Sequence, residues 1–322
     1  MTQLVAPFPY FGGKREVARM VWERLGDVPN YVEPFFGSGA VLLGRPTPPQ
    51  TETCNDLDGL LCNFWRAVAA APDEVAAHAD WPVSECDLSS RHLWLVERRG
   101  VLTQRLAADP EWFDVQAAGW WVWGACAWIG GGWCSGDGPW VRDGDTLVKR
   151  DQGRGINRQM PHLGDQGRGI NRKMPHLGDQ GRGIAEWFGR LSDRLRRVRV
   201  ACGPWDRVLG DSVTWRHGVT GVFLDPPYTS GKSAYAAGGE GGDLARAVAE
   251  WARVAGRRDD MRVALCGHLS EHDMPGWECV QWTAPGGYGN QGGDDEDDNR
   301  HRECIWFSPA CLGGGGQLGL FR

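Results

Sequence analysis

The tetrapeptide Asp225-Pro226-Pro227-Tyr228 constrains the fold most, because two consecutive prolines end whatever element precedes them. The run before it, Gly221-Val222-Phe223-Leu224, is short and apolar, which predicts a buried strand. Open α/β sheets bind their ligands at the carboxyl ends of strands, so the tetrapeptide would lie where such a site is expected. A simple strand-to-loop ending explains the same residues, and the tetrapeptide alone does not decide between the two.

The residue types in the tetrapeptide suit a planar heterocycle that carries an amino group. The Asp225 carboxylate and the Pro226 carbonyl are two acceptors for amino hydrogens, and the prolines supply no backbone N–H that would compete for that carbonyl. The ring of Tyr228 offers a face for stacking. These three residues are therefore the first candidates for catalysis, together with Pro227, which keeps the turn rigid.

Length and composition allow a large core. With 322 residues, 41% hydrophobic residues and 18 Trp, the chain has room for two domains or for one domain with a large insertion. No run approaches the ~18 apolar residues of a membrane span, and the N-terminus lacks a signal-peptide pattern, so we expect a cytoplasmic protein that does not bind membranes. The ten Cys show no metal-binding spacing, which favours reduced thiols and no metal.

Charge is distributed unevenly along the chain. The formal net charge is −6, but between Arg142 and Arg207 there are 15 Lys and Arg against 8 Asp and Glu, a local balance of +7 that leaves −13 elsewhere. One basic segment on an acidic body indicates a local contact with a polyanion. A solvated basic surface is the alternative.

A glycine-rich turn follows the stretch Tyr31-Val32-Glu33, and its last glycine precedes an apolar run that starts a helix. Such turns let a ligand approach the backbone closely, as in nucleotide-binding folds. The turn, Pro34 to Gly39, is neither a P-loop nor a full GxGxxG motif. Glu33 disfavours a phosphate here, because like charges repel, and favours a cationic group such as the ammonium of an amino acid.

A second strand, predicted from Thr51 to Cys54, leads into Asn55-Asp56-Leu57-Asp58. An acidic residue about 20 positions after a glycine turn is where nucleotide-binding α/β domains bind ribose hydroxyls. Asp is also a favoured helix cap, and helical spacing follows. Both interpretations can hold, with Asp56 on a ribose and Asp58 at the cap.

Four motifs in this order resemble the adenine-specific DNA methyltransferases related to the deoxyadenosine (Dam-like) methylases. They are Tyr10-x-Gly12-Gly13-Lys14, Phe35-x-Gly37-x-Gly39, Asn55-Asp56 and Asp225-Pro226-Pro227-Tyr228. Matching blocks extend from Pro9 to the Glu303–Phe307 strand. The resemblance implies a Rossmann-like α/β sheet that binds S-adenosylmethionine, with an inserted target-recognition region.

The resemblance also implies roles for individual residues. Asp56 would bind the ribose of S-adenosylmethionine, and the backbone from Phe35 to Gly39 would pass under its methionine part. The residues expected to line the cofactor pocket are Tyr10, Lys14, Glu33, Phe35, Gly37, Gly39 and Asp56. An acidic residue that the family often carries after a third strand is matched loosely here, by Asp206.

A tandem repeat of 14 residues occupies the basic segment. The unit beginning at Asp151 recurs from Asp165 with one change, Gln159 to Lys173, and a truncated copy begins at Asp179. The units have too few apolar residues to form a core, but their Gly-Arg-Gly and Asn-Arg sequences suit phosphate contacts. The residues predicted to bind DNA are Arg154, Arg158, Arg168, Arg172 and Lys173. A duplication tolerated in a surface loop is the alternative.

The predicted organisation is a discontinuous catalytic domain, residues 1–70 and 185–322, interrupted by a target-recognition region, residues 71–184. An adenine within duplex DNA would have to be flipped out to reach Asp225. Other readings stay open: cytosine-N4 methylation, whose site more often begins with Ser; an RNA or protein-glutamine methyltransferase, which usually has Asn first; and a catalytically inactive DNA-binding module. A restriction endonuclease partner is neither indicated nor excluded.

Overall fold

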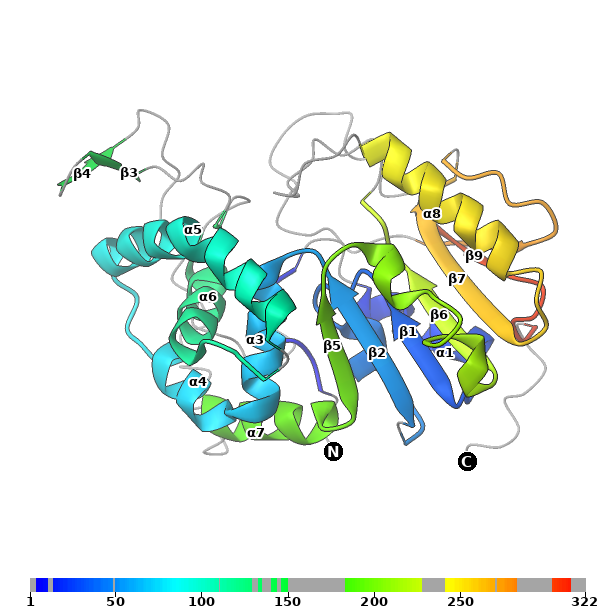
Figure 1. Ribbon diagram of the computed structural model, residues 1–322, viewed down its shortest axis with the longest axis horizontal. Helices are drawn as coiled ribbons and strands as arrows, with labels where there is room; N and C mark the ends of the chain where they lie inside the picture. The colour runs from blue at the N-terminus through cyan, green and yellow to red at the C-terminus, as the bar shows by residue number, and fades with distance from the viewer. Residues whose placement is uncertain are drawn as a thin grey trace. The chain divides into compact units, whose positions relative to one another are not determined.

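The structure is a computed structural model (Figure 1). It describes residues 4–10, 14–48, 50–109, 111–128, 133–134, 140–143, 146–149, 183–227, 241–269, 271–282 and 303–313. The chain divides into two compact units. The helical unit comprises Met1–Phe11, Asp56–Arg196 and Val200–Gly203, and the sheet unit comprises Gly12–Asn55, Arg197–Arg199 and Pro204–Arg322. The division at Asn55 differs from the predicted boundary after residue 70, and the predicted domains stay a prediction.

A seven-stranded sheet has the order β5-β2-β1-β6-β7-β9-β8. Strand β1 pairs in parallel with β2 and β6, and β6 with β7, whereas β9 is antiparallel to β7 and β8. The strands are β1 (Asn30–Glu33), β2 (Thr51–Asp56), β5 (Val198–Cys202), β6 (Thr220–Leu224), β7 (Met261–His268), β8 (Glu278–Gln281) and β9 (Glu303–Phe307). The predicted α/β class is thus confirmed as a mixed sheet that is mostly parallel. The strand predicted before Asp225 is β6, and all five of its residues are buried.

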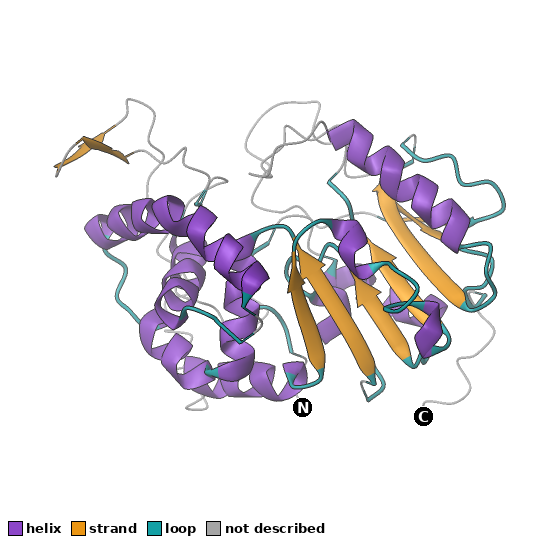
Figure 2. Ribbon diagram, in the orientation of Figure 1, coloured by secondary structure: helices purple, strands orange, loops and turns teal. Residues whose placement is uncertain are grey.

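Helices cover both faces of this sheet within the sheet unit. Helices α1 (Arg15–Leu25) and α8 (Gly241–Ala255) both contact β7, and Figures 1 and 2 show α8 in front of the sheet and α1 behind it. The buried residues of α1 recur at helical spacing, which is why this segment forms an amphipathic helix: Val17, Ala18, Val21, Trp22 and Leu25. Helix α2 (Ala40–Leu43) is a single turn that ends at Gly44.

The helical unit contains five helices among its described residues. They are α3 (Gly59–Ala70), α4 (Pro72–Ala79), α5 (Glu85–Ala108), α6 (Val115–Ala127) and α7 (Ile184–Leu195). A hairpin of β3 (Trp140–Asp143) and β4 (Thr146–Lys149) precedes the repeat. The Asp58 carboxylate accepts a hydrogen bond from Leu60 N at 3.0 Å, which confirms its predicted cap on α3. Trp121 and Trp123 are buried in α6 and belong to the core of this unit. None of the described helices is long and apolar enough to cross a membrane.

Candidate functional site

The carboxyl edge of the parallel strands collects four charged side chains of the sheet unit. Strands β1 and β6 are parallel neighbours, with Val32 opposite Val222, so Glu33 and Asp225 come to the same edge. Strand β9 runs the opposite way and pairs its first residue, Glu303, with the last residue of β7. An antiparallel strand therefore begins where its parallel neighbours end, which brings Glu303 to this edge as well. Lys14, just before α1, completes the group.

Lys14 is the cation of this group, and it is 5% exposed. Its Nζ lies 3.1 Å from Asp225 Oδ1 and 3.9 Å from Glu303 Oε2. The ammonium also lies 5.7 Å from the centroid of the Trp282 ring. Burial by itself lowers the pKa of Lys14, but the negative groups around it, Asp225 first, more than compensate and raise that pKa overall. Lys14 therefore stays protonated. We call Lys14, Glu33, Asp225 and Glu303 the edge cluster.

Glu33 is almost fully buried, at 2% exposed. Burial raises its pKa well above the usual value; the hydrogen bond from Tyr31 lowers it, and the charge of Asp225 raises it further. Burial likewise raises the pKa of Glu303, with Lys14 opposing the shift. The edge cluster thus contains three carboxyl groups and one ammonium, and it would carry excess negative charge if all were ionised. Such a site favours an additional cation.

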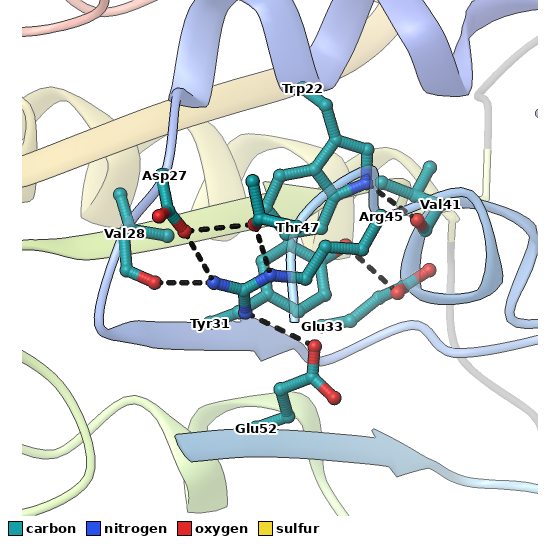
Figure 3. A network of polar contacts seen from close by, with 9 residues as sticks. All are labelled: Trp22, Asp27, Val28, Tyr31, Glu33, Val41, Arg45, Thr47 and Glu52. Carbon is teal, nitrogen blue, oxygen red and sulfur yellow. Dashed lines mark hydrogen bonds and ion pairs between the residues drawn. The ribbon is translucent and has the colours of Figure 1, made fainter. Parts of the chain in front are cut away.

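A buried network behind β1 supports Glu33, as Figure 3 shows. The Tyr31 hydroxyl donates to Glu33 Oε2 at 2.9 Å, and the Tyr31 ring packs against Trp22 with centroids 4.8 Å apart. Trp22 in turn donates to the carbonyl of Val41 at 2.7 Å, and the Arg45 guanidinium lies 5.0 Å from the Trp22 ring. The position of Glu33 therefore depends on residues that do not belong to the edge cluster.

The glycine turn after β1 requires a backbone that only glycine adopts easily. Gly37 and Gly39 have φ of 48° and 62°, and Gly39 N donates to Phe36 O at 2.8 Å. A Cβ on Gly39 would lie 2.7 Å from the Phe36 ring. Asn55 secures the turn from β2, because its side chain donates to Pro34 O at 3.2 Å and its carbonyl accepts from Phe36 N at 2.9 Å. The predicted Asn55-Asp56 motif thus has a structural part that sequence reasoning missed.

Phe35, at the start of this turn, is partly buried. Its ring lies nearly parallel to that of Trp205, with an interplanar angle of 16° and centroids 6.2 Å apart. Trp205 begins the short 3-10 helix Trp205–Val208 that follows β5, and Asp206 beside it is exposed. Trp205, rather than the loosely matching Asp206, is therefore the residue from this segment that contacts the turn.

Asp56 and Tyr10 belong to the helical unit. Asp56 ends β2, and its Oδ1 accepts a hydrogen bond from Asp58 N at 3.0 Å, while its carbonyl accepts from Gly203 N at the same distance. Tyr10 is partly buried and meets Phe8 edge to face, with centroids 6.2 Å apart. The cofactor roles predicted for both residues stay predictions.

Pro226 is buried and Pro227 partly buried directly after Asp225. Tyr228, the fourth predicted catalytic residue, lies outside the described residues. So do all five predicted DNA-binding residues, Arg154, Arg158, Arg168, Arg172 and Lys173. Within the described parts of the chain, no group of three or more His, Cys, Asp or Glu residues could hold a metal ion.

Sequence reasoning did not identify Glu303 and Trp282 as site residues. A single acidic residue that opens an otherwise apolar strand, Glu303–Phe307, is the signal that was available for Glu303. Trp282 offers no comparable signal, because it directly follows β8 in a stretch without a motif.

Part of the chain matches a known protein family. Residues 10–82 match the model of the D12 class N6 adenine-specific DNA methyltransferases. The matched range contains Lys14, Glu33, the glycine turn and Asp56, and it confirms the predicted resemblance to this family of enzymes. No curated protein matches the chain.

Proposed function

We propose that this chain is an adenine-specific DNA methyltransferase, which transfers a methyl group from S-adenosylmethionine to the N6 amino group of an adenine in duplex DNA. The observation that carries the proposal is the Asp225 carboxylate, held 3.1 Å from the Lys14 ammonium at the end of β6 and followed at once by two prolines. The family match over residues 10–82 supports the same reaction. DNA methylation by this family implies DNA as the substrate.

The charges of the edge cluster fit S-adenosylmethionine, which supplies an electrophilic methyl group on a positively charged sulfur. Glu33 is buried with a raised pKa, and a cation beside it would favour its ionised form. We propose that Glu33 and the backbone of the glycine turn hold the methionine part and that Asp56 binds the ribose hydroxyls. Tyr10 and Phe35 are proposed to complete the pocket.

The chemistry asked of the chain is to hold an adenine amino group in the reactive orientation. The nitrogen lone pair is delocalised into the ring, so it is a poor nucleophile in the free base. Hydrogen bonds from the two amino hydrogens to the Asp225 carboxylate and the Pro226 carbonyl would localise this lone pair and direct it away from both acceptors. The rate then depends on alignment and on fixed charges near the reacting atom.

The base must leave the duplex before Asp225 can reach its amino group. Flipping costs roughly a few kcal/mol. Stacking on an aromatic ring returns ~1–3 kcal/mol per base, and we propose that Tyr228 supplies this ring.

A transfer assay tests the proposal. The purified chain is incubated with duplex DNA and S-adenosylmethionine carrying a tritiated methyl group, and the DNA is then digested to nucleosides. We expect the label in N6-methyladenine. Label in N4-methylcytosine would instead establish the cytosine-N4 alternative. Absence of any transfer by a chain that binds both DNA and cofactor would leave an inactive DNA-binding module.

The proposed role of Asp56 predicts a loss of cofactor affinity. Asp56→Ala should raise the dissociation constant for S-adenosylmethionine by roughly one to two decades, because charged hydrogen bonds worth ~1.5–3 kcal/mol are lost. Isothermal calorimetry measures the constant. Asp58→Ala is the matched control: it removes the cap of α3 and should cost ~1 kcal/mol of stability with unchanged cofactor affinity. Equal affinities for wild type and Asp56→Ala would leave Asp56 a residue of the turn before α3.

The repeat predicts two different outcomes for two deletions. Removing Asp165 to Gly178, one whole copy, should leave methyl transfer and sequence preference nearly unchanged, because near-identical copies have not diverged in role. Removing residues 151–182 deletes all copies of the repeat and spares α7, which begins at Ile184. This deletion should weaken binding to DNA of every sequence. It should also lower the slope of log affinity against log salt concentration by about one for each lost phosphate contact. Wild-type DNA affinity after the larger deletion would contradict a DNA-binding role for the repeat.

A further inference from the structure

We propose that Cys62 and Cys202 form a reversible disulfide when the chain meets a peroxide, and that this disulfide weakens the binding of S-adenosylmethionine through Asp56. The pair is a modification site within the helical unit, and its effect on the cofactor rests on the proposed role of Asp56. The geometry points to this pair because Cys62 Sγ lies 3.4 Å from the carbonyl oxygen of Asp56. It lies 3.4 Å as well from that of Ala201, the residue before Cys202.

Two segments far apart in the sequence bring these thiols together. Cys62 lies near the start of α3, and Cys202 is the last residue of β5. Both cysteines are reduced, and both are almost fully buried, at 2% and 3% exposed. Their side chains are hydrogen-bonded to each other. A buried cysteine by itself acts as a small apolar residue, whereas two thiols in contact can also be oxidised to a disulfide.

The two thiols differ in acidity, and this difference decides which sulfur reacts first. The hydrogen bond with Cys62 lowers the pKa of Cys202, although burial opposes the shift. The same hydrogen bond, followed by burial, raises the pKa of Cys62 well above its usual value. The thiolate rather than the thiol is the nucleophile in such reactions. Cys202 is therefore the attacking sulfur, and Cys62 keeps its proton until the second step.

The oxidation balances with hydrogen peroxide as the oxidant. The Cys202 sulfur attacks one peroxide oxygen, the O–O bond breaks, and the departing hydroxide takes up the proton that Cys202 has released. The Cys62 sulfur then attacks the sulfenic acid formed at Cys202, and the S–O bond breaks. The second hydroxide leaves with the Cys62 proton as water. Two thiols are thus oxidised to one disulfide, and one peroxide is reduced to two waters.

The turn after β5 brings the chain from Cys202 to solvent within two residues. Gly203 is half-buried and Pro204 is exposed. A small oxidant therefore needs only a local opening of this turn to reach the Cys202 sulfur. In a reducing compartment the pair would stay reduced at rest, and the disulfide would be transient, as is usual for redox-sensing cysteines there.

Closing the disulfide changes the surroundings of Asp56. The Asp56 carbonyl accepts hydrogen bonds from the Cys62 thiol at 3.4 Å and from Gly203 N at 3.0 Å. A disulfide removes the thiol hydrogen and draws the two sulfurs to about 2.05 Å from each other, so the first of these bonds is lost. The carboxylate of the same residue is proposed to bind the ribose. We expect the oxidised chain to bind S-adenosylmethionine about tenfold more weakly, as the loss of one hydrogen bond does.

A second pair of cysteines provides an internal control. Cys279 on β8 and Cys304 on β9 are also hydrogen-bonded to each other, but burial raises the pKa of both thiols. They are not opposite one another in the sheet, because Cys279 pairs with Trp306 and Cys304 pairs with Gln281. Neither thiol is thus activated as a nucleophile. Peroxide should leave this pair as thiols.

Peptide mapping of the full wild-type chain tests the disulfide. The reduced chain is treated with hydrogen peroxide, the remaining thiols are blocked with N-ethylmaleimide in denaturant, and the chain is digested without reductant. We expect mass spectrometry to find the Cys62 peptide linked to the Cys202 peptide, and dithiothreitol to separate them. Absence of this link, or a link between Cys279 and Cys304 in its place, would overturn the inference.

Calorimetry measures the consequence for the cofactor. The dissociation constant for S-adenosylmethionine should rise about tenfold on oxidation and return after dithiothreitol. In Cys62→Ser and in Cys202→Ser, peroxide should leave this constant within about threefold of the untreated value of the same variant. Cys134→Ser removes another buried cysteine of the helical unit and should respond to peroxide as the wild type does. A tenfold response that persists in Cys62→Ser would assign the effect to another residue and overturn the inference.

The wild-type measurements decide even where a serine variant does not fold. A linked chain that binds S-adenosylmethionine as tightly as the reduced chain would overturn the control of cofactor binding. Failure of the reduced wild-type chain to bind S-adenosylmethionine would overturn the proposed function, and with it the effect on the cofactor. The mapped link between Cys62 and Cys202 does not depend on the cofactor, so the two failures are distinguishable.

Discussion

Asp225→Ala should abolish methyl transfer while leaving the fold and the affinity for S-adenosylmethionine nearly unchanged. The carboxylate is expected to orient the adenine amino group, and misaligned attack costs at least about 10²-fold in rate. The change leaves the buried Lys14 ammonium, which keeps Glu303 Oε2 at 3.9 Å, so we also expect some loss of stability, and the rate is measured at a temperature where the variant remains folded. Single-turnover transfer of labelled methyl groups measures the rate, and calorimetry measures cofactor binding.

A matched control separates this effect from a general loss of negative charge. Asp260 lies just before β7, at the edge of the sheet where the parallel strands begin, and forms an exposed ion pair with Arg258. Asp260→Ala should therefore transfer at close to the wild-type rate. If Asp225→Ala retained more than roughly a few per cent of that rate, the proposed catalytic role would be wrong, since alignment should cost more.

Arg45→Ala should destabilise the sheet unit by about 3–5 kcal/mol, because removing one partner of a buried ion pair leaves the other charge uncompensated. The Arg45 side chain is fully buried and donates to Glu52 Oε1 at 3.2 Å, and Glu52 is fully buried as well (Figure 3). The guanidinium also donates to Asp27, Thr47 and the carbonyl of Val28. Urea denaturation of variant and wild type measures the difference in the free energy of unfolding.

The exposed pair of Arg19 and Glu23 is the control for this prediction. Its loss in Arg19→Ala should cost under ~1 kcal/mol, as exposed pairs do. Removing both buried charges, in Arg45→Met with Glu52→Gln, should cost less than the sum of the two single changes, because neither charge is then left alone. Equal losses for Arg45→Ala and Arg19→Ala would contradict an energetic role for the network in Figure 3.

The network around Arg45 also contacts Glu33 of the edge cluster, through Trp22 and Tyr31. Arg45 stacks on Trp22, Trp22 contacts Tyr31, and Tyr31 donates to Glu33. Asp225→Ala should therefore lower the transfer rate far more than its loss of stability explains, whereas Arg45→Ala should change mainly the stability at temperatures where the chain remains folded. Measuring both properties for both variants distinguishes a residue that reacts from one that supports the fold.

Several elements were predictable because they depend on a few neighbouring residues. An apolar run ended by two prolines predicted β6, and the apolar run after the glycine turn predicted the start of α2. The cap at Asp58 follows from its short side chain reaching the next backbone N–H groups. The order of four motifs likewise predicted the family that the match over residues 10–82 supports. Local geometry and motif order are properties of the sequence itself.

The contacts that join distant segments were not predictable in this way. The sequence predicted the strand Glu303–Phe307, but only the pairing of this strand, β9, with β7 in the opposite direction brings Glu303 to the edge where Asp225 lies. Lys14 was predicted to serve the cofactor, and only the folded chain shows its ammonium beside the Asp225 carboxylate.

The sequence by itself therefore determined the strands and helices that it encodes locally, the glycine turn and the place of the candidate carboxylate Asp225 after β6. Tertiary structure decided which charge pairs with that carboxylate, how Arg45 and Glu52 compensate each other, and that α3 packs with the helical unit. The physical reason is that the two kinds of property depend on different neighbours. Backbone conformation responds to neighbours within a few residues, whereas the ionisation and direction of a buried side chain respond to whichever groups the fold brings within a few ångströms.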